Sequence, residues 1–200
     1  MANDVDRRIQ ALVAVLQRGD SPEALAELKA LGARDALRHE ARESPNLAVR
    51  EDAISALSSM RHPGDLDTLL DLFRDDYVQD LAQLCVERDW GATATVALVA
   101  RLGRCDSDCL CLLEALENVG DESALGEPLL AMVGHEDHPT ADAAAEAIVG
   151  IGTRTGNVRL ARELLERGQR LSHNIYVCER VRSLIDYLDG LSTESGPPPK

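Results

Sequence analysis

Apolar residues recur along most of the chain at the spacing of amphipathic helices. In the segment 47–60, Val49 and Leu57 fall on one side of a helix, and Arg50 and Ser58 fall on the opposite side. We therefore expect this helix to bury one side only. No segment alternates apolar and polar residues over a length that would predict a strand. The pattern predicts an almost wholly helical protein with about twelve helices.

A turn residue, either glycine or a polar residue in its place, follows the helical runs about every 30 residues. These positions are Gly32, Arg61, Gly91, Gly120 and Gly152. The period is typical of stacked helical hairpins, in which each repeat packs against its neighbours. We therefore predict an all-α fold, a right-handed α-solenoid of about five to six hairpins. It would form a single domain at 1–190, followed by a disordered tail at 191–200.

The chain carries a formal net charge of −14, and this charge is unevenly distributed. No lysine or arginine lies between Arg104 and Arg154, whereas many aspartates and glutamates do. The excess of negative charge argues against nucleic acid and against an anionic membrane surface as partners, because both are negatively charged. It favours a basic protein partner instead.

Three glutamates in that acidic stretch occupy related positions in the repeat. Glu114 and Glu146 each precede a predicted turn glycine by the same number of residues, and Glu117 lies one helical turn after Glu114. On stacked inner helices these carboxylates would form one stripe, which Glu51 and Asp52 would extend toward the amino end. We predict that these five residues bind the partner. The alternative is a solvated acidic surface without a binding role.

Two segments resemble a known repeat family. Residues 49–57, Val-Arg-Glu-Asp-Ala-Ile-Ser-Ala-Leu, and 115–121, Ala-Leu-Glu-Asn-Val-Gly-Asp, resemble the second helix and turn of HEAT-like repeats. The similarity is to the short bacterial type that is also found in phycobilin lyases. It implies that the helices at 47–60, 110–119 and 141–149 line an inner, concave wall. A tetrapyrrole pocket like that of the lyases would need aromatic walls, yet aromatic residues make up only 2% of the chain.

The five cysteines, in a chain without a secretory signal pattern or a long apolar run, predict reduced thiols in a cytoplasmic protein that does not span a membrane. Cys105, Cys109 and Cys111 could hold zinc if a fourth ligand joined them. Cys111 points to another side of the helix, however, so we expect these side chains to fill space between helices. The loop 135–138, His-Glu-Asp-His, could hold a cation or could simply cap the next helix.

One short motif suggests a metal enzyme. His39 and Glu40 resemble the His-Glu dyads of deoxyhypusine hydroxylase, a HEAT-repeat di-iron enzyme. That enzyme needs four such dyads, whereas this chain has only this one and His135 with Glu136. The chain also lacks a G-x-S-x-G motif and a phosphate-binding glycine loop. We therefore predict no catalytic residues, no metal site and no cofactor.

Together these features predict a non-enzymatic scaffold, monomeric on its own, whose acidic concave face binds a basic protein. Its scaffold and charge resemble those of acidic immunity proteins that neutralise bacterial toxins. The resemblance implies toxin inhibition as one form of the function, and a regulatory adaptor is the other. The alternative from a different class is a HEAT-repeat enzyme, lyase-like or metal-dependent, that uses the His-Glu or cysteine clusters.

Overall fold

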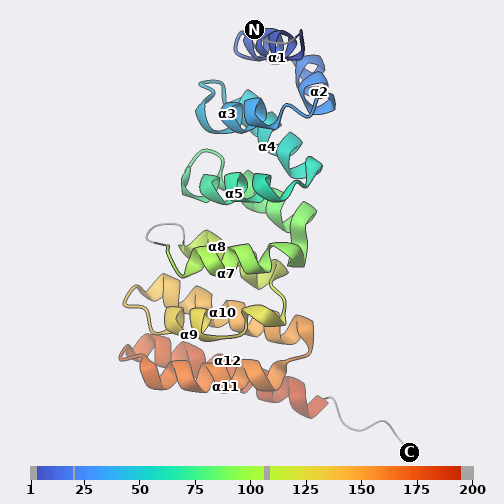
Figure 1. Ribbon diagram of the computed structural model, residues 1–200. Helices are drawn as coiled ribbons and strands as arrows, with labels where there is room; N and C mark the ends of the chain where they lie inside the picture. Colours follow the sequence, from blue (N-terminus) through green and yellow to red (C-terminus); the bar gives the residue numbers. More distant parts are fainter. Residues whose placement is uncertain (1–3, 20, 106–108, 195–200) are drawn as a thin grey trace, which may run out of the picture. The chain divides into compact units, whose positions relative to one another are not determined.

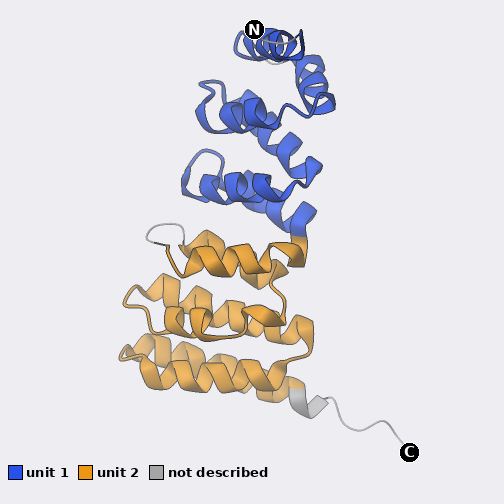
Figure 2. Ribbon diagram, in the orientation of Figure 1, with its two compact units in different colours: residues 1–90 blue, residues 91–200 orange. Residues whose placement is uncertain are grey.

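The chain folds into helices joined by short turns in a computed structural model, which describes residues 4–19, 21–105 and 109–194 (Figure 1). Within these ranges no residue belongs to a β-strand, which confirms the prediction of an all-α protein. The structure divides into two units, residues 1–90 and 91–200, and each is described by itself (Figure 2).

The first unit is built from three pairs of helices among its described residues. The helices are α1 (Asp4–Leu16), α2 (Pro22–Ala30), α3 (Arg34–Glu43), α4 (Leu47–Met60), α5 (Pro63–Asp71) and α6 (Gln79–Cys85). A 3-10 helix, Leu72–Arg74, follows α5, and a π-helical turn, Val86–Trp90, follows α6. Helix α1 contacts α2, α3 contacts α4, and α5 contacts α6, while α4 also packs against both α2 and α6.

The second unit repeats this arrangement with three further pairs. The helices are α7 (Thr95–Leu102), α8 (Cys109–Val119), α9 (Glu127–Val133), α10 (His138–Thr155), α11 (Val158–Leu171) and α12 (Ile175–Glu194). Two short 3-10 helices, Gly91–Ala94 and Glu122–Ala124, precede α7 and α9. Helix α10 packs against α8 on one side and α12 on the other, so these three lie side by side (Figure 1). Both units are therefore built from repeated helical pairs.

Ion pairs join neighbouring pairs of helices in the first unit at about one repeat length. Arg38 on α3 donates two hydrogen bonds to one carboxylate oxygen of Asp65 on α5, which lies 27 residues later and has a fully buried side chain. Arg42 on α3 pairs with Asp71 on α5, 29 residues later. The separations match the predicted repeat, because corresponding helices of adjacent pairs lie next to each other.

Helix α4 differs from its prediction because it buries polar residues as well as apolar ones. Arg50 is only 9% exposed, and its Nε donates to the carbonyl of Ala41 at 3.0 Å while its guanidinium pairs with Asp75. Ser58 is fully buried, and its hydroxyl donates to a carboxylate oxygen of Asp89 at 2.6 Å. The expectation of a one-sided helix is wrong because polar side chains can be buried once their polar atoms are bonded.

The predicted turn residues are confirmed at four positions, among them Gly120, which directly follows α8, and wrong at one. Gly32, Arg61 and Gly91 have φ angles of 64°, 49° and 51°, in the left-handed region that ends many helices. Helix α10, in contrast, continues through Gly152 and ends before Gly156, whose φ is 75°. The periodic spacing therefore predicted a turn at Gly152, which lies inside α10, four residues before the glycine that ends this helix.

Gly152 serves close packing between two helices. A Cβ atom placed on it would lie only 2.4 Å from the Cβ of Ala161 on α11, a distance that real side chains do not show. Any larger residue at 152 would push α10 and α11 apart. This role leaves no trace in the spacing of turns, because it depends on a contact between two different helices.

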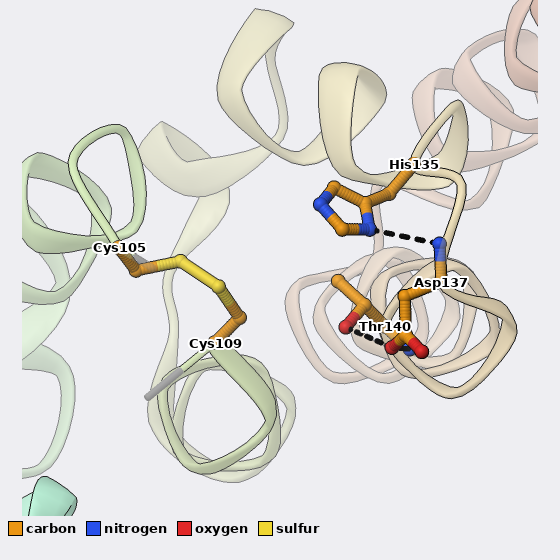
Figure 3. Close-up of a disulfide and its surroundings, with 5 residues drawn as sticks. All are labelled: Cys105, Cys109, His135, Asp137 and Thr140. Atoms are coloured by element: carbon orange, nitrogen blue, oxygen red, sulfur yellow. Dashed lines mark hydrogen bonds between the residues drawn. A yellow bond between two sulfur atoms is a disulfide. The ribbon is translucent and has the colours of Figure 1, made fainter. Parts of the chain in front are cut away.

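A disulfide joins Cys105 to Cys109 at the start of α8 (Figure 3). The prediction of reduced thiols is therefore wrong for this pair. Their Cα atoms are 5.7 Å apart, a separation typical of disulfides. Cys85, Cys111 and Cys178 remain thiols, and Cys85 is fully buried between helices, as expected of a small apolar residue.

Helix α12 continues to Glu194, so its backbone extends into the segment 191–200 for which we expected a disordered tail. The rest of that segment, 195–200, lies outside the described residues. The prediction of one domain at 1–190 stays a prediction, because the two units are described separately.

Candidate partner-binding site

Glu114, Glu117 and Glu146 of the predicted site come together in the second unit. The apolar residues of α8 and α10 face the core and are buried, namely Leu112, Leu113, Ala115 and Leu116 on α8 and Ala144, Ala145, Ala147 and Ile148 on α10. The three glutamates fall between these positions, so that Glu114 is exposed whereas Glu117 and Glu146 are half-buried. The helical pattern therefore places all three outside the buried core of their helices.

Helices α8 and α10 approach closely beside Glu117. A Cβ atom placed on Gly150 of α10 would lie 2.7 Å from Cγ of Glu117 and 3.2 Å from its carbonyl oxygen. The absence of a side chain at Gly150 thus allows the stem of Glu117 to lie against the backbone of α10. This contact explains why Glu117 is half-buried although it belongs to a charged surface.

The three carboxylates act on one another electrostatically. Burial raises the pKa of Glu117, and the negative charges of Glu146 and Glu114 raise it further. The positive charge of Arg154 opposes these effects. The three acidic residues that we expected on one stripe are therefore close enough for their charges to interact.

Arg154 on α10 binds the backbone rather than the Glu117 side chain. Its guanidinium donates to the carbonyl oxygens of Leu116, Glu117 and Gly120, at the carboxyl end of α8. The carbonyl of Leu116 also accepts a hydrogen bond from the amide of Gly120. The arginine adds hydrogen bonds at this end of α8 and neutralises the negative end of the helix dipole. Among the described residues, the Glu117 carboxylate has no hydrogen bond and no ion pair.

Glu146, in contrast, has a cationic partner that sequence reasoning missed. Arg180 on α12 forms an ion pair with it across 34 residues of sequence. The absence of lysine and arginine between Arg104 and Arg154 suggested an uncompensated acidic surface, but a following repeat supplies this positive charge. For Glu114 and Glu117 the structure shows no ion pair among the residues that it describes.

A groove of about 570 Å³ lies beside these residues, and we call it the α8–α10–α12 groove. Its lining consists of Glu117 from α8, Glu146, Val149, Gly150 and Thr153 from α10, and Arg180, Ser183, Leu184 and Tyr187 from α12. Its volume falls in the range of ligand-binding pockets in proteins. Its walls combine acidic, apolar and aromatic groups, as binding surfaces for proteins often do.

Two tyrosines on α12 belong to the same face and were not predicted as site residues. Tyr187 lines the groove and is 54% exposed, and Tyr176 is 70% exposed. Tyr176, Arg180 and Tyr187 follow helical spacing, so they lie on one side of α12. The ring of Tyr176 contacts that of His138, with ring centres 6.1 Å apart. The helical spacing of these tyrosines is visible in the sequence, and tyrosine is a common residue at protein-binding surfaces, so this signal could have been used.

Glu51 and Asp52 lie on α4 in the first unit, where Glu51 is exposed and Asp52 is half-buried. Their predicted role in extending the acidic face stays a prediction, because the two units are described separately.

The candidate metal ligands are engaged in local contacts. Asp137 caps α10 by accepting hydrogen bonds from the amide and the hydroxyl of Thr140, and His135 Nδ1 accepts from the amide of Asp137 (Figure 3). The sulfurs of Cys105 and Cys109 are bonded to each other and cannot serve as thiolate ligands. No cluster of three or more potential metal ligands occurs in the part of the chain that the structure describes.

The buried Glu40 of the His-Glu motif accepts a hydrogen bond from Gln17 at 3.2 Å. Its other carboxylate oxygen is buried without a hydrogen-bond partner in the structure. Helix packing therefore accounts for the place of this residue.

No protein-family model matches the chain, and no curated protein matches it. None of the helices formed by the described residues is both long enough and apolar enough to cross a membrane. Similarity thus assigns no family, and the groove itself carries the functional inference.

Proposed function

We propose that this chain is a HEAT-like repeat protein, a right-handed α-solenoid, that acts as a non-enzymatic scaffold and binds a basic partner protein. The helical pairs, the turns about 30 residues apart and the resemblance at 49–57 and 115–121 support the repeat family. The α8–α10–α12 groove supports the binding role. The single observation that carries the proposal is the half-buried Glu117 carboxylate, which lies beside an open groove and among acidic neighbours without a bonded cation.

A basic partner would relieve an electrostatic cost that the isolated protein bears. Burial and the charges of Glu114 and Glu146 disfavour the ionised form of Glu117, which is why its pKa is raised. A lysine or arginine from a partner would lower this cost and would form a charge-assisted hydrogen bond. The net charge of −14 would also speed the approach of a basic protein and repel acidic competitors.

This function has two forms that the groove fits equally well. An immunity protein would neutralise a basic toxin by covering its surface, and a regulatory adaptor would bring a basic protein to another component. Both forms need the same acidic contact, so the same variants test both.

The test compares two variants that remove the same amount of charge. Glu114→Gln with Glu117→Gln removes the charge of Glu117, which lines the groove, and that of Glu114, which acts on it electrostatically. Glu146 is kept because it pairs with Arg180. The control, Asp67→Asn with Glu136→Gln, removes two exposed carboxylates that do not line the groove. Each protein is used as bait in an extract of the native organism at low salt, and bound proteins are identified by mass spectrometry.

We expect a basic protein that the original chain and the control capture equally and that the groove variant captures about tenfold less. Higher ionic strength should weaken the capture by the original chain in the same direction. The proposal is wrong if the groove variant and the control retain the partner to the same extent, or if the captured partner is acidic.

A further inference from the structure

We infer that the α8–α10–α12 groove receives an arginine side chain of the partner, whose guanidinium pairs with Glu117 and lies against the ring of Tyr187. The inference rests on the proposed function and specifies the chemistry of its partner. It follows from three features of the groove: the carboxylate of Glu117, which has no ion pair among the described residues, the apolar side chains that line the groove, and the exposed ring of Tyr187.

Glu117 is the groove carboxylate that has room for a new cation. Glu146 already pairs with Arg180, and Arg154 is held by the three carbonyl oxygens at the end of α8. Neither arginine can turn to Glu117 without breaking these contacts. A cation from outside would therefore meet Glu117 without competition from the protein's own arginines.

The groove also offers surface for an apolar stem. Val149 and Leu184 supply aliphatic walls, and Gly150 lines the groove without adding a side chain. The three-carbon stem of an arginine can lie on such a surface while its charged end reaches a carboxylate. The volume of about 570 Å³ exceeds that of one side chain, so residues flanking the arginine would also fit.

Tyr187 favours arginine over lysine. Its ring lines the groove and is 54% exposed, so a face is open to an incoming group. A guanidinium is planar and weakly hydrated, stacks on aromatic rings and pairs with a carboxylate through two parallel hydrogen bonds. An ammonium group is more strongly hydrated and would lose more on entering a half-buried site. The groove already accommodates one guanidinium beside a carboxylate, in the pair of Arg180 with Glu146.

The probes are three acetylated and amidated pentapeptides, Gly-Ala-X-Ala-Gly, with arginine, lysine or citrulline at X. Citrulline keeps the shape of arginine and removes its charge. Each is titrated at low salt into the full-length protein labelled with ¹⁵N, and the amide signals are followed by NMR. We expect the arginine peptide to shift the signals of Gly150 and Ser183, the lysine peptide to bind at least about threefold more weakly and the citrulline peptide to produce no shift.

Variants identify the contacts. Glu117→Gln should abolish the shifts, and Tyr187→Leu should weaken binding, whereas Tyr187→Phe should retain it because the ring and not the hydroxyl makes the contact. The control Asp67→Asn with Glu136→Gln should behave as the original chain does. Unchanged amide signals outside the groove show that each variant is folded.

The inference fails if lysine binds as well as arginine, if citrulline produces the same shifts, or if the arginine peptide shifts signals elsewhere but not in the groove. None of these results would overturn the proposed function, because the capture of a basic partner is measured separately with the doubly substituted variant. Loss of that function would show in the capture experiment, whatever the peptides do.

Discussion

Arg180 on α12 pairs with Glu146 on α10, although 34 residues of sequence separate them. The pair shows that charge in a repeat protein has to be balanced across neighbouring helices rather than along the chain. Some carboxylates of a stretch without lysine or arginine are therefore neutralised by arginines from later helices. Glu117, in contrast, lines the groove without an ion pair among the described residues.

Replacing Glu117 by glutamine is expected to stabilise the isolated protein slightly at neutral pH. Because its pKa is raised by burial and by its acidic neighbours, the folded state holds the Glu117 proton more tightly than the unfolded state does. This contribution is fully present below the ordinary glutamate pKa and is lost as pH rises through the raised value.

Urea unfolding at a series of pH values measures the effect. Glu117→Gln should match the original chain near pH 4 and should be more stable at pH 7 by about 0.5 kcal/mol. The control Asp67→Asn with Glu136→Gln should follow the original chain over this interval. A constant difference between Glu117→Gln and the original chain at all pH values would contradict the electrostatic explanation.

Asp89 should show the opposite dependence on pH. Its pKa is lowered to about 2, first by the hydrogen bond from Arg88 and also by that from Ser58. The stability it contributes is therefore present above the ordinary aspartate pKa and is lost as pH falls through about 2. Asp89→Asn should cost about 2 kcal/mol at pH 7, and the difference should shrink between pH 4 and pH 2.

Asp35→Asn is the matched control for Asp89. The side chain of Asp35 is 99% exposed and pairs with Arg38, so the same substitution should change the free energy of unfolding by less than about 0.5 kcal/mol. Equal losses in the two variants would mean that the hydrogen bonds of Asp89 with Arg88 and Ser58 do not stabilise the fold.

Removing the disulfide should lower stability modestly. The bond closes a very short loop, with a separation of 4 residues, so it restricts the unfolded chain less than a long loop would. We expect Cys105→Ser with Cys109→Ser to cost about 2 kcal/mol in urea unfolding. A dithiol reductant should produce a similar loss in the original chain and no change in the double variant. An unchanged original chain after verified reduction would show that the bond does not stabilise the fold.

Two glycine substitutions should have opposite effects. Gly152→Ala should destabilise the protein by roughly 1–3 kcal/mol, because the new Cβ meets Ala161 on α11. Gly190→Ala, also within a helix, places its Cβ where no atom lies within 4 Å, so it should stabilise by up to about 1 kcal/mol. Thermal unfolding measures both, and a stabilising Gly152→Ala would show that α10 and α11 are not closely packed there.

The sequence predicted the features that depend on local order. Helical periodicity identified the repeated pairs, and the left-handed turns at Gly32 and Gly91 followed from the spacing of glycines. It also placed Glu114, Glu117 and Glu146 on one side of their helices. The turns and the spacing of Glu114 and Glu117 depend on residues within one or two turns of each other, whereas the place of Glu146 beside them depends on the packing of α10 against α8.

The features that sequence reasoning missed depend on contacts between helices. Arg50 is buried because Asp75 and a carbonyl bind it, and Gly152 lies inside a helix because a neighbouring helix approaches it. The disulfide was missed for a different reason, since composition suggested reduced thiols although the two cysteines are only four residues apart in the sequence. The helical spacing of the tyrosines of α12 is visible in the sequence, but only the structure shows that Tyr187 lines the groove.

Gly150 has a consequence for the thermodynamics of binding. At Gly150 the groove is lined by main chain of α10, which the hydrogen bonds of the helix hold in place and which carries no rotatable side chain. Such a surface has little conformational freedom to lose when a ligand arrives. The entropy lost on association would come mainly from Tyr187 and from the ligand, so a ligand that is itself rigid should gain affinity without any additional contact.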